Sequence, residues 1–289
     1  MTQPLSATTP ERPIKIGLLG SGISGTRTPR MHLYAAEALD LPYSYDLIDA
    51  TVRDLPEDPA EILSMLEAEG YDGLNVTYPF KRAVMGVLDE VSDSARKVGA
   101  VNTVLLKGGQ RKGHNTDHWG FTESLRRGLP DAKKGQVLQL GAGGAGGAVA
   151  HALLDDGVGQ LMIRDVGEGT AEALAARLCD TYGAGRARAV GDVMDVAGQV
   201  DGIVNCTPVG MDKHPGLPLS AAAIDPRQWV ADIVYFPLET ELLATARALG
   251  CAVLPGSGMA LYQAVRAFKL FTGQEPDIDR MREAFASFD

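Results

Sequence analysis

The stretch QVLQLGAGGAGGAVAHALL, residues 136–154, joins an apolar run, a glycine-rich turn and a run of small and aliphatic residues. Gly141, Gly143 and Gly146 follow the G-x-G-x-x-G spacing between a predicted strand and a predicted helix. Such glycines permit a tight turn and let the backbone approach a pyrophosphate, whose charge then lies at a helix N-terminus. The turn could also serve packing alone, but its strand and helix context favours a dinucleotide site. The loop residues expected to take part are Gly141, Gly143, Gly144, Ala145 and Gly146.

An acidic residue follows the next predicted strand, QLMIRD, whose last residue is Asp165. This position, about 20 residues beyond the glycines, is where a carboxylate accepts hydrogen bonds from the adenosine ribose. A carboxylate there repels a 2′-phosphate, so NAD is favoured over NADP. Arg164 keeps NADP possible, although neighbours on a strand point to opposite faces. As an alternative, Asp165 caps the helix that follows it.

Apolar runs alternate with helix-period segments along the whole chain, which is typical of βα repeats and parallel sheets. In the first part the predicted strands cover 14–20, 43–50 and 73–77, and the helices 28–40, 59–70 and 79–91. Thr28 is expected to cap its helix, with Pro29 in the first helical position. Residues 101–107 and 108–115 suggest an antiparallel hairpin. After a helix at 117–130, the predicted strands are 135–141, 160–165, 187–191, 202–207 and 229–235, and the helices 144–157, 169–183, 239–250, 258–273 and 277–288.

Composition excludes several classes of function. The net charge of -10 and the lack of a basic cluster argue against a nucleic-acid partner. No apolar run approaches the roughly 18 residues of a membrane span. The three cysteines and five histidines lack metal-ligand spacing, so no metal site or disulfide framework is expected. The start, MTQPLSATTPERP, lacks a signal pattern and is expected to be a disordered lead-in, which leaves a reducing cytoplasm as the expected location.

Polar residues lie where predicted strands end or helices begin, namely Thr26, Thr28, Lys81, Asn102 and Asp117. Lys81 follows the strand GLNVT, at the sheet edge where open α/β sheets bind ligands. A solvated lysine is the simpler alternative for that position. Among these residues, Lys81 and Asp117 form the pair suited to proton transfer, and spacing alone equally allows a structural salt bridge.

Eight segments in order resemble the shikimate/quinate dehydrogenase family over nearly the whole chain. They are GTRTPRMH, NVTYPFK, GAVNTV, GHNTD, GAGGAGGA, NCTPVGM, DIVYFPLETELL and GSGMALYQAVRAFKLFTG. The resemblance implies an oxidoreductase of aromatic amino acid biosynthesis that interconverts a ring alcohol and its ketone and exchanges hydride with a nicotinamide. It also implies a cyclic hydroxy acid as substrate, and a homodimer as a possible assembly.

The resemblance assigns roles to individual residues. Lys81 matches the catalytic lysine and Asp117 its partner on the substrate hydroxyls. Thr26 and Thr28 match a Ser-x-Ser pair that binds the substrate carboxylate. The remaining matches to substrate ligands are Thr77, Asn102, Tyr235 and Gln263. The matches that line the cofactor site are Cys206, Thr207, Pro208, Gly256 and Met259.

The pattern and the resemblance together predict two α/β domains with a cleft between them. Residues 13–118, completed by 259–289, form the substrate-binding domain, and residues 119–258 form a Rossmann-like NAD(P)-binding domain.

Three departures from the family pattern bear on specificity. Both carboxylate-site serines are threonines, and Asp165-Val-Gly replaces the Asn-Arg-Thr of NADP-dependent members. His118 and Trp119 follow the NTD motif without an evident role. Shikimate is the expected substrate, with quinate as the second candidate. The alternatives are a related ring acid such as aminoshikimate, or a non-catalytic nucleotide sensor, against which the presence of both Lys81 and Asp117 argues.

Overall fold

The computed structural model describes residues 12–287, so the predicted disordered lead-in lies almost wholly outside the described residues. Contacts divide the chain into two compact units. The first unit contains the residues up to Ser92, Val101–His114 and the chain from Ala264, and the second contains Asp93–Ala100 and Asn115–Gln263. This division groups Asp117 with the glycine-rich loop, whereas the sequence-based boundaries, which remain a prediction, group it with the substrate domain.

The first unit is built on a six-stranded sheet in the order β2-β1-β3-β5-β6-β4. Strands β1, β2 and β3 are parallel, β5 is antiparallel to both β3 and β6, and β4 is parallel to β6. The strands are β1 (Ile14–Gly20), β2 (Tyr43–Asp49), β3 (Gly73–Val76), β4 (Glu90–Val91), β5 (Thr103–Lys107) and β6 (Gln110–His114). Because β1, β2 and β3 run the same way, the loops that leave them gather at one edge of the sheet.

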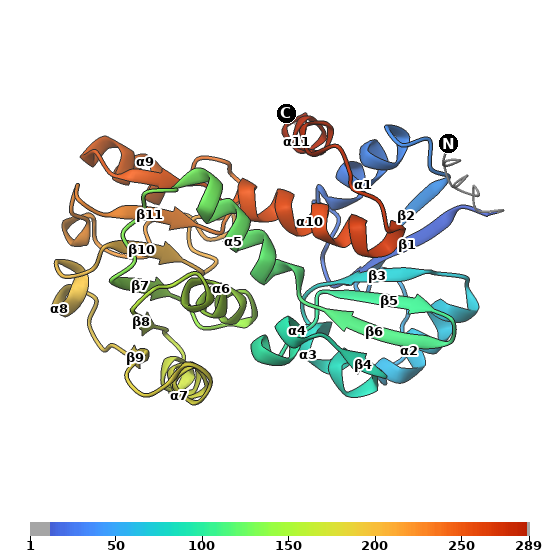
Figure 1. The fold of residues 1–289 in the computed structure, drawn as a ribbon, viewed down its shortest axis with the longest axis horizontal. Coiled ribbons are helices and arrows are strands. Elements are labelled where there is room, and N and C mark those ends of the chain that lie inside the picture. The colour runs from blue at the N-terminus through green and yellow to red at the C-terminus, as the bar shows by residue number, and fades with distance from the viewer. Residues whose placement is uncertain (1–11, 288–289) are drawn as a thin grey trace, which may run out of the picture. The chain divides into compact units, whose positions relative to one another are not determined.

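Figure 1 shows the helical segments of the first unit, of which the last in the chain packs against the first. They are α1 (Thr28–Glu37), α2 (Pro59–Ala68), α3 (Phe80–Ala83), the 3-10 turn η1 (Val84–Val87), α11 (Ile278–Ala286) and the second half of α10 (Ser257–Thr272). Phe271 of α10 packs with Ile16, Leu18 and Tyr45 of the sheet. A Cβ on Gly73 would lie 2.5 Å from the Phe271 ring, so the glycine allows α10 to lie close to the sheet.

Two local predictions for this unit are wrong. The single helix predicted for residues 79–91 is instead the short α3, the turn η1 and strand β4. Thr28 does not cap α1, because the helix already begins at Thr28 and Arg27 occupies the N-cap position without a side-chain cap. The Thr28 amide donates instead to Thr26 Oγ1 at 3.3 Å.

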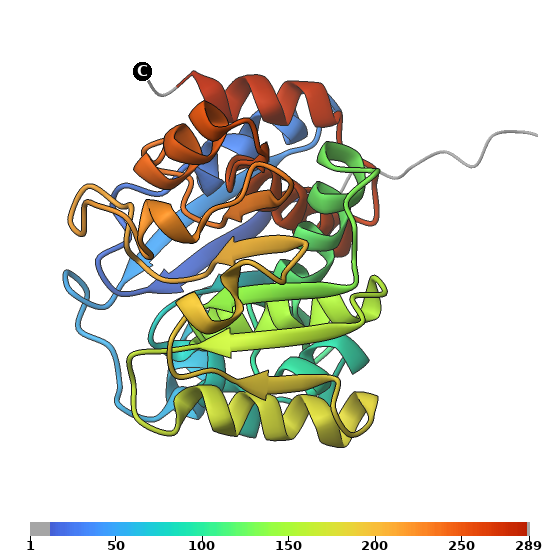
Figure 2. The same cartoon turned by 90° about the vertical axis from the view of Figure 1, so that its left-hand side faces the viewer.

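The second unit contains a parallel six-stranded sheet in the order β12-β11-β10-β7-β8-β9 (Figure 2). Its strands are β7 (Gln136–Leu140), β8 (Gln160–Arg164), β9 (Ala187–Ala189), β10 (Gly202–Asn205), β11 (Trp229–Asp232) and β12 (Ala252–Leu254). Counted from β7, this is the 3-2-1-4-5-6 order of dinucleotide-binding sheets, in which ligands bind where the strand order reverses. Here that point lies between β7 and β10.

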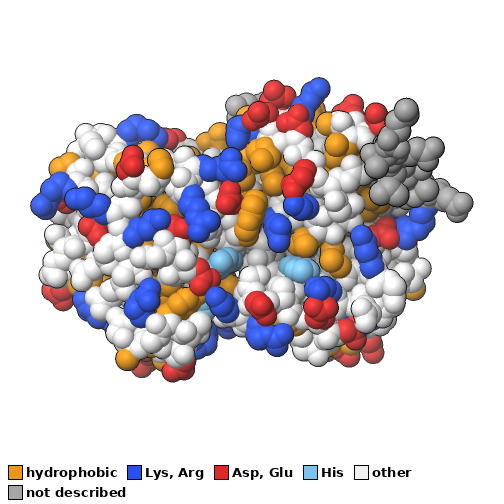
Figure 3. All heavy atoms as spheres, viewed as in Figure 1, with side chains coloured by type: hydrophobic (Ala, Val, Ile, Leu, Met, Phe, Trp, Pro, Cys, Tyr) orange, Lys and Arg blue, Asp and Glu red, His pale blue; other side chains and the backbone are white. Residues whose placement is uncertain are grey.

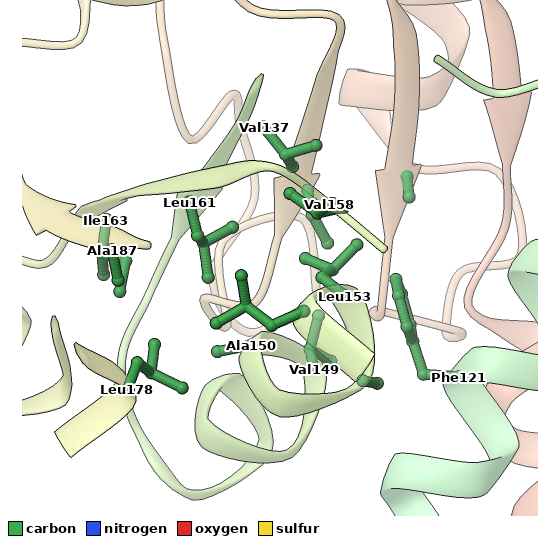
Figure 4. Close-up of a cluster of buried hydrophobic side chains, with 14 of the residues drawn as sticks. Phe121, Val137, Val149, Ala150, Leu153, Val158, Leu161, Ile163, Leu178 and Ala187 are labelled. Atoms are coloured by element: carbon green, nitrogen blue, oxygen red, sulfur yellow. The ribbon is translucent and has the colours of Figure 1, made fainter. Parts of the chain in front are cut away.

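Both faces of the second sheet are covered by helical segments, and strand residues alternate between the two faces. Val137, Leu161 and Ile163 belong to one core with α6 (Gly144–Asp155) and α7 (Thr170–Tyr182), as Figure 4 shows. Their neighbours Leu138 and Met162 belong to the other core. The remaining helical segments of the unit are α4 (Asp93–Val98), α5 (Thr116–Gly128), α8 (Met194–Ala197), the 3-10 turn η2 (Ala221–Ala223), α9 (Glu241–Leu249) and the first half of α10, up to Gln263.

The surface carries both signs of charge. On the face drawn in Figure 3, acidic and basic side chains intermingle, so neither sign of charge gathers in one patch there. Within residues 12–287, no helix has both the length and the apolar character that crossing a membrane requires.

Candidate active site

The three motif glycines of the glycine-rich loop differ in their surroundings. Gly141 has φ +93°, and a Cβ there would lie 2.8 Å from the Cys206 backbone. A Cβ on Gly146 would lie 2.4 Å from the Gly141 carbonyl oxygen, so this glycine lets α6 pack against the loop. Gly143, the N-cap of α6, has nothing within 4 Å of an added Cβ. Two glycines are therefore needed for packing, while Gly143 leaves open space at a helix N-terminus.

Gln139, which was not predicted as a site residue, stabilises this loop through side-chain hydrogen bonds. Its fully buried side chain donates from Nε2 to the carbonyl oxygens of Gly141 at 2.8 Å and Gly146 at 2.9 Å. The side chain thus joins the first and third motif glycines. The available sequence signal was a polar residue between two leucines, two positions before the first glycine.

Asp165 lies beside the glycine-rich loop. Its Oδ2 accepts from the Ala142 amide at 2.7 Å, and its Oδ1 accepts from the Gly167 amide at 2.7 Å. It does not cap α7, whose N-cap is Gly169. The side chain of the adjacent Val166 is 97% exposed. The carboxylate is therefore fixed at the end of β8, next to the turn that would receive a dinucleotide.

A buried polar network supports the loop after β10. Asp232 accepts from Asn205 Nδ2 at 2.9 Å and from the Thr240 hydroxyl at 2.7 Å. Asn205 in turn accepts from the Thr207 hydroxyl at 2.7 Å and donates to the Val209 carbonyl at 2.9 Å. Burial raises the pKa of Asp232 to about 6, although three hydrogen bonds act in the opposite direction. The network fixes the loop that contains Cys206, Thr207 and Pro208.

The other predicted cofactor residues lie around the ends of β10 and β11. Burial raises the pKa of the Cys206 thiol well above its ordinary value, which keeps it protonated. Tyr235, which the resemblance matches to a substrate ligand, follows β11 and is 37% exposed. Gly256 packs tightly, since a Cβ would lie 2.5 Å from the carbonyl oxygens of Ile233 and Val234. Met259 is buried in the core beneath the glycine-rich loop, so its described contacts are those of packing.

The first unit brings Thr77, Lys81 and Asn102 together at the carboxyl end of β3. The Val76 amide, just before Thr77, donates to the Asn102 carbonyl at 2.8 Å. The Lys81 carbonyl accepts from the Val101 amide at 2.8 Å. Thr77 and Lys81 are half-buried, and Asn102 is buried. Three residues from two distant segments therefore gather around one strand end.

Thr26 lies in the loop after β1 and Thr28 begins α1 at the end of that loop, which meets the loop after β3 at the same edge. The two threonine hydroxyls lie 3.2 Å apart, and the Ser21 amide donates to the Tyr78 carbonyl at 3.0 Å. Asp49 anchors the β1 loop by accepting from the Gly22 and Ile23 amides, each at 2.9 Å. Hydrogen bonds from Thr51 and from these amides hold the pKa of Asp49 well below its ordinary value. Sequence reasoning missed Asp49, whose signal was its position at the end of strand β2.

Asp117 and Gln263 both belong to the second unit. Asp117 is buried in the first turn of α5, whose N-cap Asn115 accepts from the His118 amide at 3.1 Å. One turn later, a Cβ on Gly120 would lie 2.7 Å from the Gln263 backbone nitrogen. The close approach of α5 and α10 therefore puts Gln263 beside the first turn of α5.

The structure gives packing roles to His118 and Trp119. His118 Nε2 lies 2.9 Å from Asp155 Oδ2 on α6, and Lys97 of α4 pairs with the same carboxylate at 3.1 Å. The Trp119 ring meets Tyr262 of α10 edge-on, with 6.4 Å between ring centres. These contacts join α5 to α6 and α10, and α4 to α6.

Two family models match the chain. The model described as the shikimate dehydrogenase substrate binding domain matches residues 18–104, and the one described as the shikimate 5'-dehydrogenase C-terminal domain matches residues 256–284. Among curated proteins, the shikimate dehydrogenase (NADP(+)) of Streptomyces avermitilis is 49% identical over 269 residues, covering 92% of each chain. The quinate/shikimate dehydrogenase (NAD(+)) of Corynebacterium efficiens is 45% identical, covering 95% of this chain and 98% of the other.

Solved structures of similar proteins cover nearly the whole chain. Quinate dehydrogenase from Corynebacterium glutamicum in complex with NAD superposes with a TM-score of 0.91 at 44% identity, covering 96% of this chain and all of the other. Shikimate 5-dehydrogenase from Thermus thermophilus in complex with NADP(H) and shikimate has a TM-score of 0.82 at 36% identity, covering 94% and 98% of the two chains.

Proposed function

The chain belongs to the shikimate/quinate dehydrogenase family, and we propose on this premise that it interconverts shikimate and its 3-dehydro ketone, with NAD as the favoured partner in hydride transfer. The observation that carries the proposal is the glycine-rich loop. Its Gly143 faces open space at the N-terminus of a 12-residue helix, beside the reversal point of the sheet. An anionic pyrophosphate fits this combination of exposed amides and helix dipole.

The preference for NAD rests on Asp165. Its carboxylate is held by the Ala142 amide, next to the glycine-rich loop, and each carboxylate oxygen can accept more than one hydrogen bond. A ribose hydroxyl can therefore donate to Asp165, whereas a 2′-phosphate would meet a like charge. The nearly fully exposed Val166 supplies no cation to offset that repulsion.

Lys81 is the proposed proton carrier. In the oxidation direction its neutral amine takes the proton of the substrate hydroxyl while hydride leaves the same carbon, and in the reduction direction its ammonium returns that proton. The nicotinamide, when bound, accepts or supplies the hydride. Asp117 is proposed to accept a hydrogen bond from the substrate and to keep the hydroxyl aligned with the amine.

The substrate carboxylate is proposed to bind the Thr26 and Thr28 hydroxyls, which lie 3.2 Å apart on a loop fixed by Asp49. Asn102, Thr77, Gln263 and Tyr235 are proposed to contact the remainder of the ring. Each threonine adds a methyl that a serine lacks, and that bulk disfavours the tetrahedral, hydroxylated C1 of quinate relative to the flat C1 of shikimate. One methyl in a pocket is worth roughly 10–200-fold in specificity.

The test is the initial rate of reduced nicotinamide formation with shikimate or quinate, each supplied with NAD or NADP. The expected order of kcat/KM is shikimate above quinate and NAD above NADP. A protein that binds NAD but turns over neither ring acid would be a nucleotide sensor, and the proposal would fall. A higher kcat/KM with NADP would contradict the role given to Asp165.

Location and assembly are further proposals. We infer a cytoplasmic location because Cys179, Cys206 and Cys251 are all free thiols, which fits a reducing compartment. Cell fractionation tests this. The homodimer expected from the family is tested by light scattering on the purified protein.

A further inference from the structure

The buried carboxylate of Asp232 receives three hydrogen bonds within the second unit. Its Oδ1 accepts from Asn205 Nδ2 and from the Val234 amide, each at 2.9 Å. Its Oδ2 accepts from the Thr240 hydroxyl at 2.7 Å. Asn205 ends β10 and Thr240 is the N-cap of α9, and both are buried as well. Asp232 therefore joins the end of β10 to the start of α9.

Asn205 connects this carboxylate to the loop that follows β10. The Val209 carbonyl, which can only accept, lies 2.9 Å from Asn205 Nδ2 and so fixes the orientation of the amide. Asn205 Oδ1 then accepts from the Thr207 amide at 3.0 Å and from the Thr207 hydroxyl at 2.7 Å. Both hydrogens and both lone pairs of the Asn205 amide are thereby used. One fixed side chain thus ties Asp232 to Thr207 and Val209, on either side of Pro208.

This arrangement fits an ionised Asp232 and not a protonated one. Because Oδ1 faces two N–H donors, an added proton would have to lie on Oδ2, facing Thr240. The Thr240 oxygen already accepts from the Leu243 amide at 3.3 Å. If it also accepted the proton of Asp232, its own hydrogen would have to turn away from the one acceptor that it has among the described residues, inside a fully buried site. The hydrogen bonds to Oδ1 would also lose the charge that strengthens them.

Asp232 changes its protonation in a range that a binding assay can reach. Burial raises the pKa of Asp232 to about 6, although its three hydrogen bonds act in the opposite direction. Burial, and then the charge of Asp232, raise the pKa of the nearby Cys206 thiol well above its ordinary value, so that this thiol stays neutral. Glu239 and Glu241, which flank Thr240, are exposed, and β12 beside β11 is apolar. Asp232 is therefore the ionisable side chain among those that the network links.

We propose that Asp232 and Asn205 are positioning residues for the cofactor, and that NAD binds tightly only while the Asp232 carboxylate is ionised. This rests on the proposed function, in which the loop after β10 lines the cofactor site. Loss of the charge detaches Thr240 from Oδ2 and weakens the hydrogen bond from Asn205, and the loop that Asn205 holds then moves away from NAD.

The same proton has the opposite effect on the free energy of unfolding. Because the pKa of Asp232 is raised, the folded state binds this proton more tightly than the unfolded chain does, and the proton stabilises the fold. A general loosening of the fold would lower stability and NAD affinity together. A rise in one with a fall in the other therefore distinguishes a role in positioning.

The test is calorimetric titration of NAD into the unmutated protein from pH 5 to pH 8. At pH 5 about a tenth of the Asp232 carboxylates are ionised, so the affinity should be about 10-fold lower than at pH 8. Binding at pH 5 should also release a proton, which titrations in buffers of different ionisation enthalpy detect. Asp232→Asn keeps the shape of the side chain and removes its charge, so its affinity should be about 10-fold lower than that of the unmutated protein at pH 8 and should not change with pH. Relative to this variant, the unmutated protein should gain unfolding free energy from pH 8 to pH 5 while it loses affinity.

Two further substitutions serve as controls. Histidine is the side chain that ordinarily changes its charge between pH 5 and pH 8, and His214 lies exposed in the same loop. His214→Gln should therefore keep the pH dependence of the unmutated protein. If Asp232→Asn does not fold, Thr240→Val replaces it, with Thr240→Ser as the matched control that keeps the hydroxyl. The affinity at pH 8 should fall about 5-fold in the valine variant and stay unchanged in the serine variant.

An affinity for NAD that changes less than about 2-fold between pH 8 and pH 5 would overturn the proposal. So would a pH dependence that persists in Asp232→Asn or disappears in His214→Gln, or an unfolding free energy that, relative to Asp232→Asn, falls together with the affinity. A protein that binds NAD but oxidises neither shikimate nor quinate would refute the proposed function and leave this proposal standing. A protein that binds NAD at no pH would refute both.

Discussion

Replacing Gly146 by alanine should damage both the stability and the cofactor affinity of the second unit. The new Cβ would lie 2.4 Å from the Gly141 carbonyl oxygen and 3.2 Å from Gln139 Nε2. The carbonyl belongs to the backbone, so the loop or α6 must move, and overpacking of this kind typically costs about 1–3 kcal/mol. For a unit of this size, that cost corresponds to a fall of roughly 2–12 °C in the melting temperature.

The same reasoning predicts that Gly143→Ala keeps the stability of the second unit and loses only affinity for NAD. A Cβ there meets nothing within 4 Å, and its φ of -70° suits alanine. The melting temperature should stay within about 1 °C of the unmutated value or rise slightly, because alanine restricts the unfolded chain. The methyl would nevertheless occupy the space proposed for the pyrophosphate, so NAD affinity should fall by at least about 10-fold, or about 1.4 kcal/mol.

The assay is thermal unfolding without ligand, followed by calorimetric titration of NAD into each variant. Gly198→Ala is the control, because Gly198 has a φ of -71° and open space but lies at the end of α8. It should match the unmutated protein in both measurements. If Gly146→Ala melts normally and binds NAD normally, the close approach of α6 to the loop is not what these glycines provide. If Gly143→Ala binds NAD normally, the pyrophosphate does not lie at that N-terminus.

Three further outcomes follow from the site. Lys81→Ala should lower kcat by about 10²–10⁴-fold with NAD affinity unchanged in titrations, and a variant that keeps more than about a tenth of the turnover would refute proton transfer by this residue. Asp165→Asn combined with Val166→Arg should shift the ratio of kcat/KM values toward NADP, and an unchanged ratio would show that the 2′ position lies elsewhere. The raised pKa of Asp232, about 6 against 3.8 when unfolded, means that the folded state binds its proton more tightly. This contribution of about 3 kcal/mol is therefore fully present below about pH 4 and lost as the pH rises through about 6. Unfolding free energies at pH 4 and pH 7 should show this slope in the unmutated protein relative to Asp232→Asn, and parallel curves would contradict it.

Much of the architecture could be predicted because its signals are local. The strand, glycine-rich turn and helix of residues 136–154 are adjacent in the chain, and Gly141 and Gly146 each meet a requirement of that turn. The alternation of apolar and helix-period segments likewise predicted most strands and helices. Local signals failed after β3, where the apolar period of residues 79–91 resembles a helix although the chain forms α3, η1 and β4.

The sequence by itself determined which residues are the candidates for the chemistry, since Lys81, Asp117 and the glycines stand in recognisable local patterns. Only the tertiary structure decided which hydrogen bonds fix the loops that contain these residues. Asp49 fixes the loop of Thr26 through amides 26 and 27 residues away, and Gln139 joins two carbonyls across a turn. Such roles arise from partners that meet only when the chain has folded, because a hydrogen bond depends on distance and angle in space and leaves no fixed spacing in the sequence.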